Sequence, residues 1–153
     1  MFFIKASSIC LCTGFVLATI AFIGKGWMSL NGYYLEGIIP YHYDSYSPWW
    51  STVCILFYIG YALYFVAAIV LLVANWEAHT KGYYKAKLLF LLCSVIFMLI
   101  AAFLIASFAV LAAHTANPGS KVSPGVSAYW ALASGVVSFA TGILCIVIVV
   151  KKC

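Results

Sequence analysis

Charged and histidine side chains divide this chain into four long apolar runs. The runs cover residues 6–24, 49–74, 88–113 and 122–150, and none contains Asp, Glu, Lys, Arg or His. They are 19, 26, 26 and 29 residues long, and a helix needs about 20 residues, at about 1.5 Å each, to cross about 30 Å of hydrocarbon. The pattern therefore predicts four transmembrane helices.

Composition agrees with a membrane protein. Of 153 residues, 67% are hydrophobic and 7% are charged, whereas about a quarter of the residues of a soluble domain are charged. A soluble domain of four buried helices would need polar helix faces, which these runs lack. The runs leave room only for two tails and three short connections, so residues 1–153 are expected to form a single four-span domain. We also expect the first run to be a retained helix, because no small-x-small cleavage site follows it.

Small residues recur at helical spacing within the runs. Short connections make successive helices antiparallel neighbours, so the expected fold class is an all-α integral membrane protein with a left-handed four-helix bundle. Small residues four apart let helix backbones approach closely, either within the bundle or at a lateral interface with another membrane protein. The candidate helix-packing residues are Gly14, Ala18, Ala131, Gly135, Ser138 and Gly142.

The lysines predict the orientation. Two of the eight, Lys25 and Lys121, lie on one side of the predicted membrane, and six lie on the other. By the positive-inside rule both ends are cytoplasmic, and the expected location is the plasma membrane. These six lysines are most simply interpreted as a basic rim beside anionic lipid, and the more specific alternative is a phosphoinositide-binding site. Arginine is absent, and nothing indicates nucleic-acid binding. The six lysines are Lys5, Lys81, Lys85, Lys87, Lys151 and Lys152.

The first outer connection begins with a hairpin pattern. Two four-residue strands, 27–30 and 33–36, flank the dipeptide Asn31-Gly32, which tolerates the two positive φ angles of a type I′ turn. We expect a small extracellular β-hairpin that packs on the helix ends, since an isolated hairpin of this size is marginal. The expected cross-strand pairs are Leu30 with Tyr33, Ser29 with Tyr34 and Met28 with Leu35.

Aromatic residues are concentrated in the same connection. Tyrosine and tryptophan favour the membrane interface in any membrane protein, and rigid amphipathic rings are also typical of binding hot spots. The candidate extracellular contact residues are Trp27, Tyr33, Tyr34, Tyr41, Tyr43 and Tyr46.

The cysteines point to packing and acylation. Cys153 follows Lys151-Lys152 at the inner interface and is the first candidate for palmitoylation, with Cys10 and Cys12 as weaker candidates. The outer connections contain no cysteine, so no extracellular disulfide is expected.

No catalytic pattern is present. The runs lack the ionisable residues from which stand-alone transporters and channels are usually built. The chain also lacks C-x-x-C, arginine and paired histidines within runs, which membrane thiol oxidoreductases, glutathione-dependent enzymes and haem proteins respectively need. We therefore expect no enzyme activity, no cofactor and no metal site.

The arrangement of the four runs and their connections resembles that of a known superfamily. A tryptophan, Trp27, follows the first run, a short basic connection TKGYYK occupies residues 80–85, and a small-residue segment YWALASG occupies residues 129–135. This arrangement is similar to that of the claudins, peripheral myelin protein and epithelial membrane proteins; a MARVEL-type four-span protein is the structural alternative. The Gly-Leu-Trp motif and the paired extracellular cysteines of that superfamily are absent, which argues against a paracellular pore.

Two functions fit this resemblance. The first is a lateral auxiliary or organising subunit of a larger membrane protein, such as an ion channel or receptor. The second is a cell–cell contact or barrier (junction) protein. The short outer connection and the small-residue helix faces favour the first. The expected partners are the lipid bilayer and other integral membrane proteins, with self-association left open.

Overall fold

The computed structural model describes residues 2–23, 28–30, 33–36, 48–115, 122–124 and 126–152. Its main elements are four long helices: α1 (Phe2–Ile23), α2 (Pro48–Lys81), α3 (Lys87–Thr115) and α4 (Val126–Lys152). All four are long and apolar enough to cross a membrane. The prediction of four apolar membrane helices is confirmed, and the chain is an integral membrane protein.

The helices extend beyond the apolar runs. α2 is 34 residues long, or about 51 Å, and so exceeds the thickness of the hydrocarbon by about 20 Å. It begins at Pro48, a residue well suited to the first helical position. Its last turns are polar but still helical, and Glu77 and Lys81 form an i,i+4 ion pair there with 3.8 Å between Nζ and Oε1. The apolar run therefore indicates the membrane-spanning part of the chain, whereas the helix itself extends further, to Lys81.

Gly82 stops α2. Its φ is +93°, and its N–H donates to the carbonyl oxygen of Ala78 over 3.2 Å, as in a left-handed helix cap. A reversal over residues 83–86 then leads directly into α3 at Lys87.

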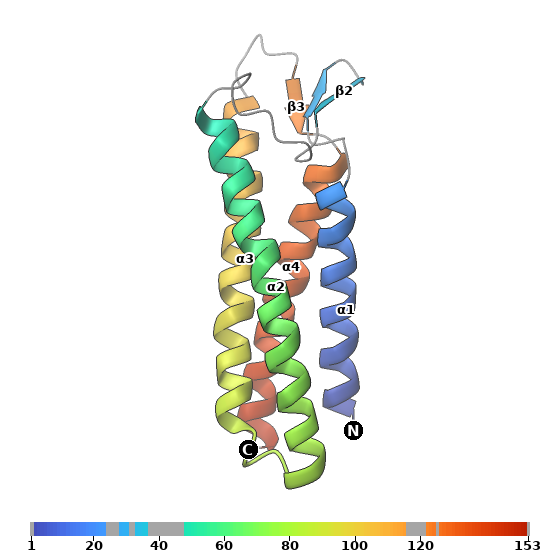
Figure 1. Cartoon of the computed structure of the whole chain (residues 1–153), viewed down its shortest axis with the longest axis vertical. Helices are drawn as coiled ribbons and strands as arrows, with labels where there is room; N and C mark the ends of the chain where they lie inside the picture. Colours follow the sequence, from blue (N-terminus) through green and yellow to red (C-terminus); the bar gives the residue numbers. More distant parts are fainter. Residues whose placement is uncertain are drawn as a thin grey trace.

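The helices pack in the order α2, α3, α4, α1. α3 packs extensively against both α2 and α4, and α1 packs against α4 but makes far fewer contacts with α2 (Figure 1). The buried positions of α1 are Ser7, Leu11, Gly14, Ala18 and Ala21. Their alternating spacing of four and three is the heptad spacing of left-handed bundles. The handedness itself stays a prediction.

Three short strands lie at one end of the bundle, opposite both ends of the chain (Figure 1). β1 (Met28–Leu30) pairs antiparallel with β2 (Tyr33–Glu36) and with β3 (Val122–Pro124). Leu30 lies opposite Tyr33 and Ser29 opposite Tyr34, as the sequence predicts. Met28 lies opposite Glu36, not Leu35, because the register shifts between Met28 and Ser29. The Asn31-Gly32 turn lies outside the described residues.

β3 was not anticipated from the sequence. The run 122–150 is uninterrupted in its apolarity, but its first residues pair with β1, and α4 begins only at Val126. Pro124 lacks a backbone N–H and fits the edge position that β3 occupies in the order β2-β1-β3. The sheet thereby joins the first and the third connection.

The cap of α2 gives a direct test. A Cβ at Gly82 would have no atom within 4 Å, so any cost of a substitution comes from the backbone alone. We expect Gly82→Val to lower stability by about 1–2 kcal/mol, because a β-branched residue disfavours positive φ. Gly82→Asn, which tolerates that region, should cost clearly less. Thermal unfolding in detergent measures both, and equal losses would contradict the cap.

Candidate functional site

A buried polar cluster joins three helices. Tyr64 of α2 is fully buried, and its hydroxyl is hydrogen-bonded to Ser138 Oγ and, over 2.8 Å, to Ser134 Oγ of α4. The Ser134 hydroxyl in turn donates to the carbonyl oxygen of Gly14 in α1 over 2.8 Å. An unpaired polar group is costly in an apolar interior. These bonds therefore hold α1, α2 and α4 in one arrangement.

Gly14 leaves the space that Tyr64 occupies. A Cβ at this position would lie 2.7 Å from Tyr64 Oη and 3.3 Å from Val137 Cγ1. Any larger residue would displace the tyrosine hydroxyl or move α1 away from α4. The glycine and the tyrosine thus depend on each other.

All six predicted helix-packing residues are buried inside the bundle. A Cβ at Gly135 would lie 3.0 Å from Ile105 Cγ1, and one at Gly142 would lie 2.9 Å from Met98 Cε. The small residues of α4 therefore allow α3 and α1 to approach α4, and none of the six is exposed to another protein. Because they are buried within the bundle, these small residues do not support a lateral interface with another protein. The six residues are Gly14, Ala18, Ala131, Gly135, Ser138 and Gly142.

Large aromatic side chains separate α1 from α2. Phe22 stacks on Tyr61 with 4.7 Å between ring centroids, and Phe15 stacks on the same ring at 5.7 Å. Phe65 meets Tyr61 edge to face at 5.5 Å, and the hydroxyls of Thr19 and Tyr61 are hydrogen-bonded at 3.0 Å. Rings of this size hold the helix axes apart, which explains why these two helices make few contacts.

Two apolar grooves open along this aromatic seam. The larger groove has a volume of about 540 Å³, and the smaller has about 260 Å³. Phe65 lines both, so they form one continuous face, which we call the α1–α2 face. The larger groove is lined by Phe22, Tyr58, Tyr61, Ala62 and Phe65, and the smaller by Leu11, Cys12, Phe15, Phe65, Ala68 and Leu72.

This face was not predicted from the sequence. Its signal was present in the aromatic residues seven apart, Phe15 with Phe22 on one helix and Tyr58 with Phe65 on the other. Residues seven apart lie on the same side of a helix. The sequence alone, however, does not show that these two helix sides face each other.

The predicted outer contact residues are only partly placed. Tyr33 and Tyr34 lie in β2, next to β1. Trp27, Tyr41, Tyr43 and Tyr46 lie outside the described residues. The extracellular contact surface stays a prediction.

The candidate acylation sites differ in depth. Because α1 begins at Phe2, Cys12 lies ten residues along it, about 15 Å from its start. Cys12 is exposed and Cys10 is partly buried, and the acylation of both stays a prediction. Cys153 lies outside the described residues, and its acylation stays a prediction. Within the described part, no group of three or more His, Cys, Asp or Glu side chains could hold a metal ion.

The dependence of Gly14 on Tyr64 can be measured with a double-mutant cycle. We expect Tyr64→Phe to cost about 1 kcal/mol, the value of a typical buried hydrogen bond, and Gly14→Ala to cost about 1–3 kcal/mol through overpacking. In the double variant the atom nearest to the new methyl group is gone, so the combined loss should fall short of the sum by about 1 kcal/mol. Additive losses in thermal unfolding would show that the two sites are independent.

Comparison with known families agrees with this architecture. Residues 1–153 match the family model described as "Tight junction protein, Claudin-like". No match was found among curated proteins. With four apolar helices in a bundle and a family match that covers the whole chain, this tetraspan membrane protein belongs to the claudin-like tight junction protein family.

Proposed function

We propose that this claudin-like protein is a non-catalytic lateral subunit that organises a larger membrane protein, such as a channel or receptor, through its α1–α2 face. The observation that carries the proposal is the open aromatic seam between α1 and α2. Small residues let α4 approach α1 and α3 closely, whereas the seam between α1 and α2 leaves a groove of about 540 Å³.

Packing is the reason why such a groove favours a partner helix. In lipid no hydrophobic effect drives helices together, so association depends on close contact and a few polar bonds. A groove offers a partner side chain contact on several sides. Its aromatic walls are held in place by stacking, including the 4.7 Å contact of Phe22 with Tyr61. Preorganised rings lose little entropy on binding.

The proposal places the protein in the plasma membrane with both ends in the cytosol. Six lysines at the end of the bundle that carries both chain ends, against Lys25 and Lys121 in the other connections, support this orientation through the positive-inside rule.

A junction role is the second candidate. The description of the matching family as tight junction proteins supports it. So does the sheet in which β3 pairs with β1, because it combines two connections into one surface at the end of the bundle opposite both chain ends (Figure 1).

Orientation is tested by labelling. In a cysteine-free background, single cysteines at Ser45 and Ser120 should react with an impermeant thiol reagent on intact cells. A cysteine at Thr80, which lies near the end of α2 and is exposed, should react only after permeabilisation. Labelling of Thr80→Cys on intact cells would refute the proposed orientation.

The two functions are separated by filling the groove. Ala62 lines the larger groove and is exposed, so Ala62→Trp fills the groove without disturbing the core. Ala102 on α3 is also exposed, and Ala102→Trp is the matched control. We expect Ala62→Trp to reduce a partner that co-purifies with the protein by at least about tenfold, equivalent to about 1.4 kcal/mol. Ala102→Trp should leave the partner bound.

The junction role makes the opposite prediction. Substitution of Tyr41, Tyr43 and Tyr46 by serine changes the outer segment and leaves the α1–α2 face intact. Loss of enrichment at cell contacts in that variant, with the partner retained by Ala62→Trp, would favour the junction role over lateral assembly.

A further inference from the structure

The α1–α2 face carries a hydrogen-bond acceptor in its larger groove. The Thr19 hydroxyl donates to the carbonyl oxygen of Phe15 over 2.9 Å, and a hydroxyl has only one proton to donate. The 3.0 Å bond between Thr19 Oγ1 and Tyr61 Oη is therefore donated by the tyrosine. Tyr61 lines the larger groove and is partly exposed. Its hydroxyl can accept a hydrogen bond from an occupant of the groove, but it has no second proton to donate.

This acceptor lies deep within the membrane. Tyr61 is twelve residues from one end of the apolar run 49–74 and thirteen from the other, or about 18–20 Å from each end. The hydrocarbon is about 30 Å thick and holds no water, and the polar groups of lipids lie outside it. A donor for Tyr61 Oη therefore has to come from a side chain on another membrane-spanning segment.

A second acceptor is buried further along the contact between α1 and α2. Asn75 of α2 is 7% exposed, and its Nδ2 donates to Ser8 Oγ over 3.1 Å and to Ser7 Oγ over 3.5 Å. The Ser7 hydroxyl gives its own proton to the carbonyl oxygen of Ile4. It can therefore only accept from Asn75, which assigns the nitrogen of the carboxamide to the side of the serines. Asn75 Oδ1 receives no hydrogen bond from any residue that the structure describes.

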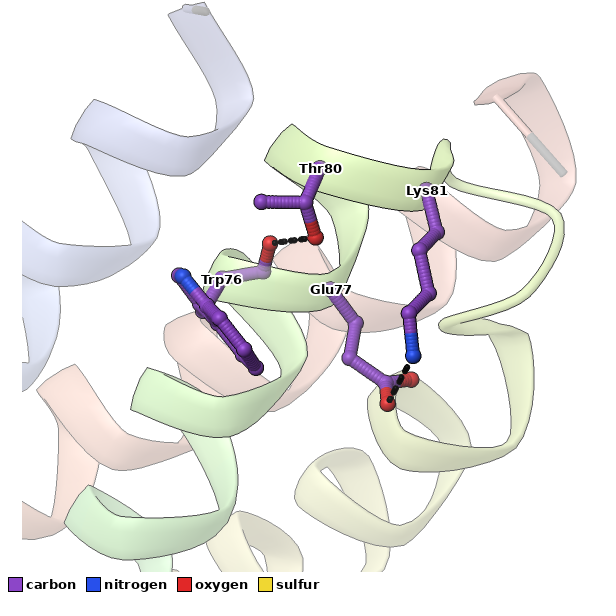
Figure 2. A network of polar contacts seen from close by, with 4 residues as sticks. All are labelled: Trp76, Glu77, Thr80 and Lys81. Atoms are coloured by element: carbon purple, nitrogen blue, oxygen red, sulfur yellow. Dashed lines mark hydrogen bonds and ion pairs between the residues drawn. The ribbon is translucent and has the colours of Figure 1, made fainter.

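The polar side chains that follow Asn75 in α2 bind one another. Figure 2 shows Lys81 extending back along the helix to Glu77, with 3.8 Å between Nζ and Oε1, and the Thr80 hydroxyl donating to the carbonyl oxygen of Trp76 over 2.9 Å. A buried acceptor without a donor destabilises a protein, and most of all within a membrane. A partner that supplies a donor to Asn75 Oδ1 would add a bond that the isolated chain lacks.

Both acceptors belong to one row of residues on α2. The row has alternating spacings of four and three, which keep its members on one side of a helix, and its first four members line the two grooves. Its ends are 14 residues apart, which is two heptads or about 21 Å. A helix that packs along the row meets both acceptors if its own donors are two heptads apart. The row consists of Tyr61, Phe65, Ala68, Leu72 and Asn75.

We propose that the partner at the α1–α2 face is a membrane-spanning helix with two hydrogen-bond donors two heptads apart, such as serine or threonine hydroxyls, which bind Tyr61 Oη and Asn75 Oδ1. A sterol or an acyl lipid carries its donors at one end only and cannot reach both acceptors. Because Asn75 is buried, its donor enters as the side chains that cover Oδ1 move aside. This inference rests on the lateral role proposed above and adds the chemistry of the partner.

Synthetic membrane helices test the proposal. The purified full chain is reconstituted in phosphatidylcholine vesicles with leucine–alanine helices of about 20 residues, and binding is measured by energy transfer between fluorophores on the two. One helix carries two serines two heptads apart, a second carries two serines on opposite sides, and a third carries none. We expect the first to bind at least about fivefold more tightly than the other two, as two hydrogen bonds in a membrane allow. Equal binding of all three would overturn the proposal.

Variants of the two acceptors locate the bonds. Tyr61→Phe removes one acceptor and keeps the ring, and Asn75→Leu removes the other at similar size, with Asn75→Ala as the alternative if leucine prevents folding. Each should at least halve the advantage of the first helix and leave the binding of the serine-free helix unchanged. Tyr129→Phe is the matched control, because it removes a hydroxyl from an exposed residue of α4, and it should keep the full advantage. If Tyr61→Phe and the Asn75 variant both keep the full advantage, the serines bind elsewhere and the proposal is wrong.

The same helices separate a failure of this inference from a failure of the lateral role. Ala62→Trp fills the larger groove, which Ala62 lines, and should weaken the binding of all three helices. If it does so while the serines give no advantage, the α1–α2 face docks a helix and only the donor pattern is wrong. If Ala62→Trp leaves the binding of all three unchanged, the helices do not dock on this face, and both the donor pattern and the lateral role lose their support.

Discussion

The arrangement of the bundle depends on one buried hydroxyl. Tyr64 Oη has to be hydrogen-bonded, because no water or lipid group can satisfy it in the interior of a membrane protein. It finds partners in Ser134 and Ser138 on α4, and Ser134 continues the chain of bonds to the backbone of α1. Gly14 must lack a Cβ for this contact to form. One polar group therefore determines how closely three helices approach, in a medium where apolar side chains alone do not select a unique arrangement.

Residue size then decides which seams close. Glycine, alanine and serine along α4 let α3 and α1 each pack closely against α4. Between α1 and α2 the facing positions hold aromatic rings, and the helices stay far enough apart to leave the grooves of the α1–α2 face. The same helices thus form a rigid core on one side and an open, preorganised surface on the other. This contrast is the physical basis of the proposed lateral role.

The two ends of the bundle differ in chemistry. One end carries the sheet in which β3 joins β1 and β2, and the other carries six lysines with one paired acidic residue. A surface made from two connections suits contact with another protein, whereas exposed lysines beside exposed Tyr84 and Leu88 suit a charged lipid surface. The division follows from where the chain places its few charges.

Sequence alone determined the four apolar helices, because crossing a bilayer requires only length and the absence of charge, and both are local properties. It also predicted that Leu30 pairs with Tyr33, since a two-residue turn sets the register beside it. Only the tertiary structure decided that α4 begins at Val126, because residues 122–124 pair with a strand far away in the chain. It also decided that Gly135 and its small neighbours face inward and that the aromatic seam faces out. Spacing along a helix shows which residues share a side, but the helix packed against that side is determined by contacts between segments distant in sequence.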